Sequence, residues 1–277
     1  MYPNLSRLRP GVLPKVDPED ERLADQVLGQ VARNPPIIEQ PGFPKAGLYD
    51  FLNVQAGEAA NRINALAAHY AGFLNQLMQT PATKDAIQGY MVADYTAVNR
   101  LLRGQEPLDK ERDVIRGKTV LEQLYRIFQN PSALLPFEIT LLRSAKYKSA
   151  RLSGSKAPSS GKAYLSRAFV STSAAPIEKY LFEKGDLSQF YDSASGCCLA
   201  VIRCPRKFPV LPLFGNQSFP RNEEYEVLLP PGVYFAFVGY LPLQQVAQQF
   251  ASKKRLPRRF SELRIPVYNA LLRPMVA

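Results

Sequence analysis

Cysteine and histidine are scarce in this chain of 277 residues, and their scarcity excludes several kinds of site. Two of the three cysteines, Cys197 and Cys198, are adjacent, so the chain offers neither an even set of disulfides nor the paired knuckles of a structural zinc site. We therefore expect no metal, and we expect the thiols, including Cys204, to be buried beside a strand in a reducing compartment. The single histidine, His69, falls in a helical pattern and lacks the partners of a catalytic triad, which favours a surface or partly buried helix position.

Long apolar runs are also missing. No stretch approaches the roughly 18 consecutive apolar residues of a membrane span, and residues 1–7 lack the apolar core of a secretory signal. With 46% hydrophobic residues, the chain can still bury a sizeable core. These features predict a soluble globular protein with one large domain, which is either cytoplasmic or exported by a route that uses no cleavable signal peptide.

Positive charge is present in excess and is unevenly distributed. The chain carries 35 lysines and arginines against 24 acidic residues, a net charge of +11. Residues 143–167 include seven basic residues and no acidic one, and a second basic cluster at residues 253–264 contains only Glu262 against it. Such clusters attract polyanions, although a solvated basic face is the commoner outcome. Nucleic acid is a possible partner but is not favoured, because no nucleic-acid-binding motif is recognisable.

Prolines divide the first 45 residues so closely that only one short helix fits, after Asp17 and with Pro18 at its first position. We expect residues 1–45 to form a flexible leader, a possible secretion or targeting segment, and residues 46–277 to form one domain. Within that domain, apolar periodicity predicts helices over residues 57–79, 83–104 and 110–129. These helices make a helical lobe, residues 46–135.

After Pro136 the periodicity becomes strand-like. Strands are predicted over residues 137–143, 164–171, 198–204, 225–229, 234–240 and 263–268, which make a β core over residues 136–277. Residues 144–162, rich in serine, glycine and lysine, are typical of a loop or insertion between strands. Helices followed by strands indicate the α+β class.

Three short segments on the predicted strands carry polar residues that fit one chemistry. Arg143 ends an apolar run, and its guanidinium has the fork geometry that matches pyrophosphate oxygens. Residues 171–173 read Ser-Thr-Ser at the end of a strand. Strand alternation would place Glu224 and Glu226 on one face about 7 Å apart, where the neighbouring negative charge should raise at least one of the two pKa values. Together these are the parts needed to hold a dinucleotide and to break its glycosidic bond.

In this order, and with Gln217–Pro220 before the glutamates and Val227–Gly232 after them, the segments resemble the arginine-serine-glutamate class of mono-ADP-ribosyltransferases. This class includes cholera-like toxins, clostridial C3-like toxins and vertebrate ecto-enzymes. Residues 87–104, with Tyr95, Asn99 and a Leu-Arg-Gly ending, resemble the helix that precedes the nucleotide-binding arginine in the family. The resemblance covers roughly residues 84–268. It implies the α+β fold of ADP-ribosyltransferases, N-terminal helices followed by a mixed or antiparallel β-sandwich core, with NAD+ as co-substrate and no metal.

The resemblance also implies roles for the first two motifs. Arg143 would bind NAD+. The hydroxyl of Ser171 would hold the catalytic glutamate in one rotamer, while Thr172 and Ser173 would secure the turn that follows and complete this part of the NAD+ site.

The two glutamates would divide the chemistry between them. Glu226 would stabilise the positive charge that builds on the ribose as its bond to nicotinamide breaks, as in glycoside hydrolysis, and would belong to the NAD+ site. Glu224 would orient or deprotonate the acceptor, and a glutamate at this position usually accompanies arginine acceptors in the family. Residues 209–221 would form the loop that recognises the acceptor, with Phe214 and Phe219 either as aromatic contacts or as packing residues at the base of the loop.

The resemblance therefore predicts an enzyme that transfers ADP-ribose from NAD+ to a side chain, arginine above all, of a host target protein. The proline-containing leader fits a bacterial effector or toxin that is secreted without a cleavable signal peptide and delivered into the cytoplasm of a host cell. Two alternatives stay open. The protein is an NAD+ glycohydrolase or acts on a nucleic acid or small molecule, which the basic clusters favour, or it is an inactive interaction module, against which the intact Arg143, Ser171, Glu224 and Glu226 argue.

Overall fold

The computed structural model describes residues 56–103, 110–146, 163–166, 168–176, 197–219, 224–242 and 264–272. The predicted leader and its boundary with the domain lie outside the described residues, as do residues 147–162 and most of the second basic cluster.

All three predicted helices of the helical lobe are present. The first is α3 (Ala56–Gln79). The second consists of α4 (Pro81–Gly89), the π-helix η2 (Tyr90–Asp94) and α5 (Tyr95–Arg103). The third is α6 (Lys110–Gln129), and the short 3-10 helix η3 (Pro131–Ala133) follows it. The helix predicted over residues 83–104 is thus continuous but contains one π-helical turn, η2, between α4 and α5. Pro81 opens α4 at a position where the missing backbone N–H costs no helical hydrogen bond.

The second half of the chain forms a mixed sheet. Its strands are β1 (Ile139–Lys146), β2 (Ala163–Ser166), β3 (Val170–Ser173), β4 (Cys197–Cys204), β5 (Leu211–Pro212), β6 (Glu226–Leu229), β7 (Val233–Pro242) and β8 (Arg264–Leu272). Hydrogen bonding runs through the order β2-β7-β8-β4-β1-β3-β6-β5. All neighbours in this order are antiparallel except β4 and β8, which are parallel. The prediction of an α+β protein with a mixed sheet is confirmed.

One predicted strand is wrong: residues 164–171 form two strands with different neighbours. β2 pairs with β7 at one edge of the sheet, whereas β3 lies between β1 and β6. The chain turns between them, where the hydroxyl of Ser166 donates to the carbonyl of Ala168 and the backbone N–H of Gly232 donates to the carbonyl of Ser166. β2 therefore ends four residues before β3 begins. The apolar pattern of residues 164–171 does not reveal this break.

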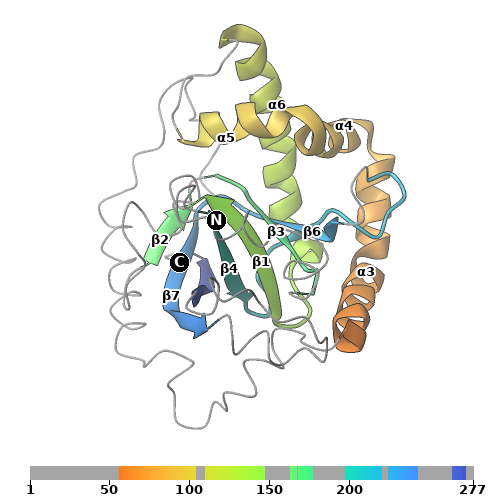
Figure 1. Cartoon of the computed structure of the whole chain (residues 1–277). Helices are drawn as coiled ribbons and strands as arrows, with labels where there is room; N and C mark the ends of the chain where they lie inside the picture. The colour runs from red at the N-terminus through yellow and green to blue at the C-terminus, as the bar shows by residue number, and fades with distance from the viewer. Residues whose placement is uncertain are drawn as a thin grey trace, which may run out of the picture.

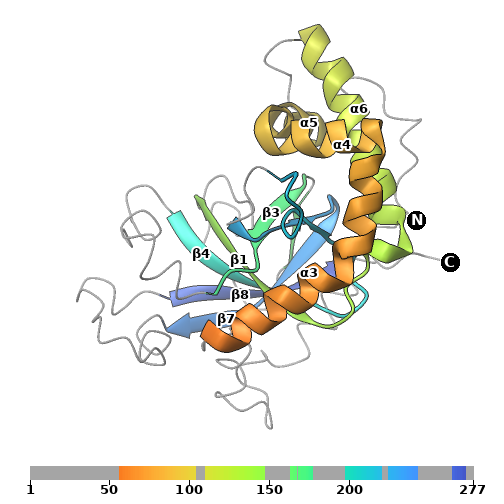
Figure 2. The same cartoon turned by 90° about the vertical axis from the view of Figure 1, so that its right-hand side faces the viewer.

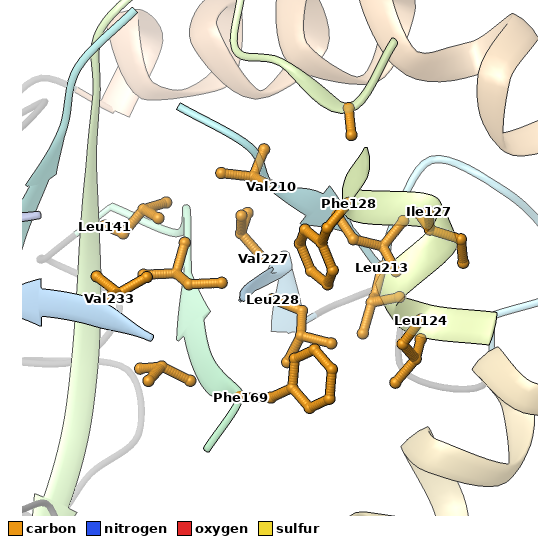
Figure 3. Close-up of a cluster of buried hydrophobic side chains, with 14 of the residues drawn as sticks. Leu124, Ile127, Phe128, Leu141, Phe169, Val210, Leu213, Val227, Leu228 and Val233 are labelled. Atoms are coloured by element: carbon orange, nitrogen blue, oxygen red, sulfur yellow. The ribbon is translucent and has the colours of Figure 1, made fainter. Parts of the chain in front are cut away.

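The helices surround the sheet on two sides. Figure 1 shows α4 and α5 beyond one end of the strands, with α6 running from there toward β3 and β6, and Figure 2 shows α3 running from this group of helices across the sheet. The main apolar cluster joins α6 to the strands of the serine and glutamate motifs. Figure 3 shows Leu124 and Phe128 of α6 next to Phe169, Leu213 and Leu228.

Phe169, immediately before β3, is the centre of this contact. Its ring is buried, with 2% exposure, and lies 5.5 Å from the ring of Tyr90, 6.2 Å from that of Tyr125 and 5.7 Å from that of Phe128. Offset and edge-to-face aromatic pairs at these distances add to the free energy gained by burial alone. The start of β3 is therefore fixed by the helical lobe.

Replacing Phe169 by alanine should lower the free energy of unfolding by about 3–5 kcal/mol, because it removes a ring that packs on three others and leaves a cavity. Urea unfolding measures the change. Val92→Ala is the control, because Val92 is 64% exposed and its truncation should cost less than about 0.5 kcal/mol. Equal costs for the two substitutions would contradict the assignment of Phe169 as the contact that ties β3 to the helices.

Candidate functional site

The sheet brings the arginine, serine and glutamate motifs onto three adjacent strands. β3 lies between β1 and β6 in the sheet order. Leu142 of β1 is opposite Ser173 of β3, and Ser173 is opposite Glu226 of β6. A row of paired residues thus runs from Leu142, the neighbour of Arg143, through Ser173 to Glu226, although these residues are far apart in sequence.

Arg143 makes a direct contact with the serine motif. Its Nη1 atom donates a hydrogen bond of 2.7 Å to the backbone carbonyl of Ser171. The side chain of Arg143 is half-buried, and that of Ser171 is exposed. The contact holds the Arg143 guanidinium against the backbone of the Ser-Thr-Ser segment.

The three hydroxyls of the Ser-Thr-Ser segment have different surroundings. Thr172 is buried and donates to the carbonyl of Val227 at 2.5 Å, and Ser173 is buried and donates to the carbonyl of Glu224 at 2.7 Å. Ser171 is exposed, and by the register it lies two residues from the partner of Glu226, on the same face of the sheet. Only Ser171 presents its hydroxyl at the surface, while the other two bind backbone within the protein.

The two glutamates do not lie on one regular strand, contrary to the alternation argument. β6 begins at Glu226, and Glu224 precedes it. Tyr225 between them has φ +47, in the left-handed region. Two-residue alternation holds only for extended backbone, so it does not describe this pair. Glu224 is exposed and Glu226 is half-buried, which places the two carboxylates in different environments.

The two phenylalanines predicted as aromatic contacts of the acceptor loop are core residues. Phe214 is 2% exposed and Phe219 is 4% exposed. The ring of Phe214 packs edge-to-face on that of Tyr225 with centroids 5.7 Å apart. Apolar burial stabilises the base of the loop, so these rings are the packing residues of the alternative interpretation and are not surface contacts.

The exposed part of this loop is held by the helical lobe. The side-chain amide of Gln88 in α4 donates to the carbonyl of Ser218 at 3.2 Å, and that of Asn216 donates to the side-chain oxygen of Asn75 in α3 at 3.0 Å. Gly215 has φ +80, which glycine tolerates at no steric cost. The segment before the glutamates is therefore fixed to two helices.

Asn99 connects the helical lobe to β3, a role that its position in an amphipathic helix does not reveal. Its side-chain oxygen accepts a 3.1 Å hydrogen bond from the backbone N–H of Phe169, and its side-chain nitrogen donates to the hydroxyl of Tyr90 at 3.2 Å. Tyr95, one turn earlier on the same face of α5, is 51% exposed. Both residues belong to the helix that resembles the family pattern, but only the structure separates the internal role of Asn99 from the surface position of Tyr95.

An ion cluster supports the π-helical turn. Arg116 of α6 pairs with Asp85 of α4 at 2.5 Å and with Asp94 of η2 at 2.9 Å. The hydrogen bond from Arg116 holds the pKa of the Asp85 carboxyl below its usual range, and the same contacts raise the pKa of the Arg116 guanidinium. Asp85 is solvent-exposed, so its pair with Arg116 contributes little to stability, whereas Asp94 is largely shielded.

The remaining titratable side chains indicate no second reactive centre in the described residues. Cys204 is buried at the end of β4, as predicted, and burial raises the pKa of its thiol. His69 is exposed on α3. Over the residues that the structure describes, no group of three His, Cys, Asp or Glu side chains is placed to hold a metal ion. Within those residues no helix has the length and apolar character to cross a membrane.

A family comparison agrees with this arrangement. Residues 60–238 match the family model described as ADP-ribosyltransferase exoenzyme. The chain belongs to this family. The match covers α3 through most of β7 and therefore includes all three motif strands. The protein is thus an ADP-ribosyltransferase, and NAD is the substrate of enzymes of this kind. A search of curated proteins found no match.

Several solved structures of ADP-ribosylating toxins are similar to this chain. Plx2a, an ADP-ribosyltransferase toxin from Paenibacillus larvae, is 14% identical with a TM-score of 0.48, over 76% of this chain and 94% of the toxin. The Vis toxin, an ADP-ribosyltransferase from Vibrio splendidus, is 16% identical with a TM-score of 0.42, over 78% of this chain and 88% of that one. The enzymatic component of the C2 toxin from Clostridium botulinum is 16% identical with a TM-score of 0.47, over 74% of this chain and 46% of that component. This chain thus matches less than half of the C2 component.

Replacing Asn99 by alanine should lower the free energy of unfolding by about 1–3 kcal/mol, because it leaves the N–H of Phe169 without its acceptor in a partly buried place. Chemical denaturation measures the loss. Gln88→Ala removes an exposed hydrogen bond of the same kind and should cost no more than about 1 kcal/mol. A smaller loss for Asn99→Ala than for Gln88→Ala would show that the Asn99 contact does not tie β3 to the helices.

Proposed function

We propose that this enzyme is a mono-ADP-ribosyltransferase of the arginine-serine-glutamate class that transfers ADP-ribose from NAD+ to an arginine side chain of a target protein. The row of residues across β1, β3 and β6 carries the proposal. It supports the proposal because the three motifs, separate in sequence, meet on adjacent strands in a chain of this family.

The reaction exchanges one bond at the ribose for another. NAD+ supplies the ADP-ribose: the bond between ribose C1′ and the nicotinamide nitrogen breaks, its electron pair leaves with nicotinamide, and a nitrogen of the acceptor guanidinium bonds to C1′. The acceptor nitrogen loses one proton in the process. The protein must therefore hold the pyrophosphate, stabilise positive charge at the ribose and accept a proton.

Three residues in or beside this row are suited to the first two tasks. Arg143 binds the pyrophosphate through the planar fork of its guanidinium, which its bond to the Ser171 carbonyl keeps beside β3. Glu226, half-buried at the start of β6, stabilises the ribose cation more strongly than the ground state because its charge is fixed in a partly shielded place. Ser171 presents an exposed hydroxyl on the same face and orients the Glu226 carboxylate.

Glu224 is suited to the third task. Its side chain is exposed, so an acceptor arriving from solution can reach it without displacing the residues that bind NAD+. As a carboxylate, it attracts the acceptor guanidinium and takes up the proton released when the new bond forms. The acceptor class proposed here, arginine, rests on this residue.

The target proposed is a host-cell protein, with the enzyme acting as a secreted effector or toxin in the host cytoplasm. Membership in the exoenzyme family supports this setting. Labelled NAD+ and a eukaryotic cell lysate test it directly, because a protein target becomes labelled and mass spectrometry of the labelled peptides identifies the acceptor residue. Nicotinamide release without labelled protein would instead favour the NAD+ glycohydrolase or a non-protein acceptor.

Glu226→Gln should reduce both nicotinamide release and protein labelling by about 100- to 1000-fold, because it removes a preorganised charge that acts on the ribose. Glu224→Gln should reduce protein labelling to a similar extent but leave NAD+ hydrolysis, because water needs no proton acceptor of this kind to capture the ribose cation. Both activities are read in one assay with labelled NAD+.

Glu122→Gln is the matched control for these two variants, since Glu122 is an exposed carboxylate on α6, outside the motif strands. It should leave both activities unchanged. Equal loss of hydrolysis and labelling in Glu224→Gln would contradict the separate roles of the two glutamates.

Arg143→Lys should raise the KM for NAD+ by about tenfold or more, because a lysine ammonium cannot make the paired contacts of a guanidinium with pyrophosphate. Steady-state hydrolysis of NAD+ measures KM without any protein acceptor. Arg203→Lys is the control: Arg203 lies on the neighbouring β4, and its guanidinium pairs with Glu138. An unchanged KM in Arg143→Lys would remove Arg143 from the NAD+ site.

A further inference from the structure

Tyr225, between the two glutamates, holds an unfavourable backbone conformation. Its φ of +47 lies in the left-handed region, where the side chain of an L-residue crowds the backbone. A bulky aromatic residue is rare in this region, and such strain persists only where the surroundings fix the backbone from several sides.

Three consecutive carbonyl groups fix it here. The carbonyl of Glu224 accepts from the Ser173 hydroxyl at 2.7 Å, and that of Tyr225 accepts from the backbone N–H of Ala174 at 2.9 Å. The carbonyl of Glu226 accepts from the backbone N–H of Leu213 at 2.8 Å. The first two donors lie at the end of β3 on one side, and the third lies beside β5 on the other, so the chain at Tyr225 is held between both neighbours of β6.

The contact of Ser173 is itself supported. The Ser173 oxygen also accepts from the backbone N–H of Ala175 at 3.1 Å, so this buried hydroxyl is oriented as well as placed. The ring of Tyr225 is half-buried and packs edge-to-face on Phe214, 5.7 Å away. Ring packing and backbone hydrogen bonds thus favour the same strained conformation.

We propose that the left-handed conformation of Tyr225 is a positioning device that separates Glu224 from Glu226, with Tyr225 and Ser173 as its positioning residues. This inference rests on the proposed function, in which the two carboxylates act on different partners. An extended residue at this place would put both side chains on one face about 7 Å apart, where two negative charges compete for the ribose cation. The turn instead leaves Glu224 exposed for the acceptor and Glu226 half-buried for the ribose.

A stability comparison tests the conformation without reference to activity. Tyr225→Gly and Tyr225→Ala both remove the ring and differ only in one methyl group, which is strained in the left-handed region. If Tyr225 is left-handed in solution, the glycine variant should melt higher than the alanine variant by about 2–4 °C. If the residue is extended, the order reverses, because glycine then only adds flexibility to the unfolded chain, and the inference is overturned.

An activity comparison tests the consequence. Tyr225→Asn tolerates the left-handed conformation without the ring, whereas Tyr225→Val resists it because its side chain is β-branched. With labelled NAD+ and a eukaryotic lysate, the ratio of protein labelling to nicotinamide release should fall by about tenfold or more in the valine variant and stay within about threefold of wild type in the asparagine variant.

Ser173→Ala gives a second measurement that does not depend on the folding of the valine variant. It removes the hydroxyl that donates to the Glu224 carbonyl but leaves the sequence at Tyr225 unchanged. The ratio of protein labelling to nicotinamide release should fall, while the KM for NAD+ stays unchanged. An unchanged ratio in both Tyr225→Val and Ser173→Ala overturns the inference. Glu226→Gln is assayed alongside, and full nicotinamide release in that variant counts against the proposed function itself, whatever the ratios in the other variants.

Discussion

The attachment of β3 between β1 and β6 is the constraint on which the site depends. Among the described strands, β5 and β6 are connected to the rest of the sheet through β3, which has four residues and pairs with β1 through Leu142 and Ser173. So short a strand has few ladder hydrogen bonds of its own. Its position is secured by contacts outside the ladder: the ring of Phe169 among three aromatic side chains, the Asn99 amide on the Phe169 N–H, and the Arg143 guanidinium on the Ser171 carbonyl.

This arrangement makes the helical lobe part of the site even where it contributes no reactive group. Gln88 and Asn75 hold the loop before the glutamates, and Asn99 holds the residue before β3. The helical lobe therefore fixes both the loop before the glutamates and the strand β3 that pairs with β6. A carboxylate that stabilises a transition state must be held rigidly, and here the rigidity comes from helix contacts added to a small piece of sheet.

Much of this could be predicted from the sequence, and the rest could not for definable reasons. Periodicity predicted α3 and α6 closely, because an amphipathic helix repeats its apolar residues over many turns. It merged β2 with β3, because both are apolar and only the Ser166 turn separates them. The motif residues were found by their order in the sequence. The sequence could not show that the hydroxyls of Thr172 and Ser173 donate hydrogen bonds to backbone carbonyls. Nor could it show that Phe214 and Phe219 are buried, or that the backbone of Tyr225 is left-handed. Each of these depends on what lies across the sheet, and local patterns carry no such information.

The π-helical turn η2 determines the direction in which the side chains of α5 point around the helix axis. A π turn contains one residue more than an α turn, and beside this turn a side chain on Gly89 would meet the carboxylate of Asp94 and the guanidinium of Arg116. Deleting a single residue from η2 would restore ordinary α-helical hydrogen bonding at the cost of turning α5 by about 100° about its axis. Asn99 would then face away from Phe169, and the helix would lose its register with the sheet while remaining a perfectly regular helix. A chimera that replaces residues 81–103 with an idealised helix must therefore keep the direction of each side chain around the helix axis, and not only the length and polarity of the helix. Otherwise the contact between Asn99 and Phe169 is lost.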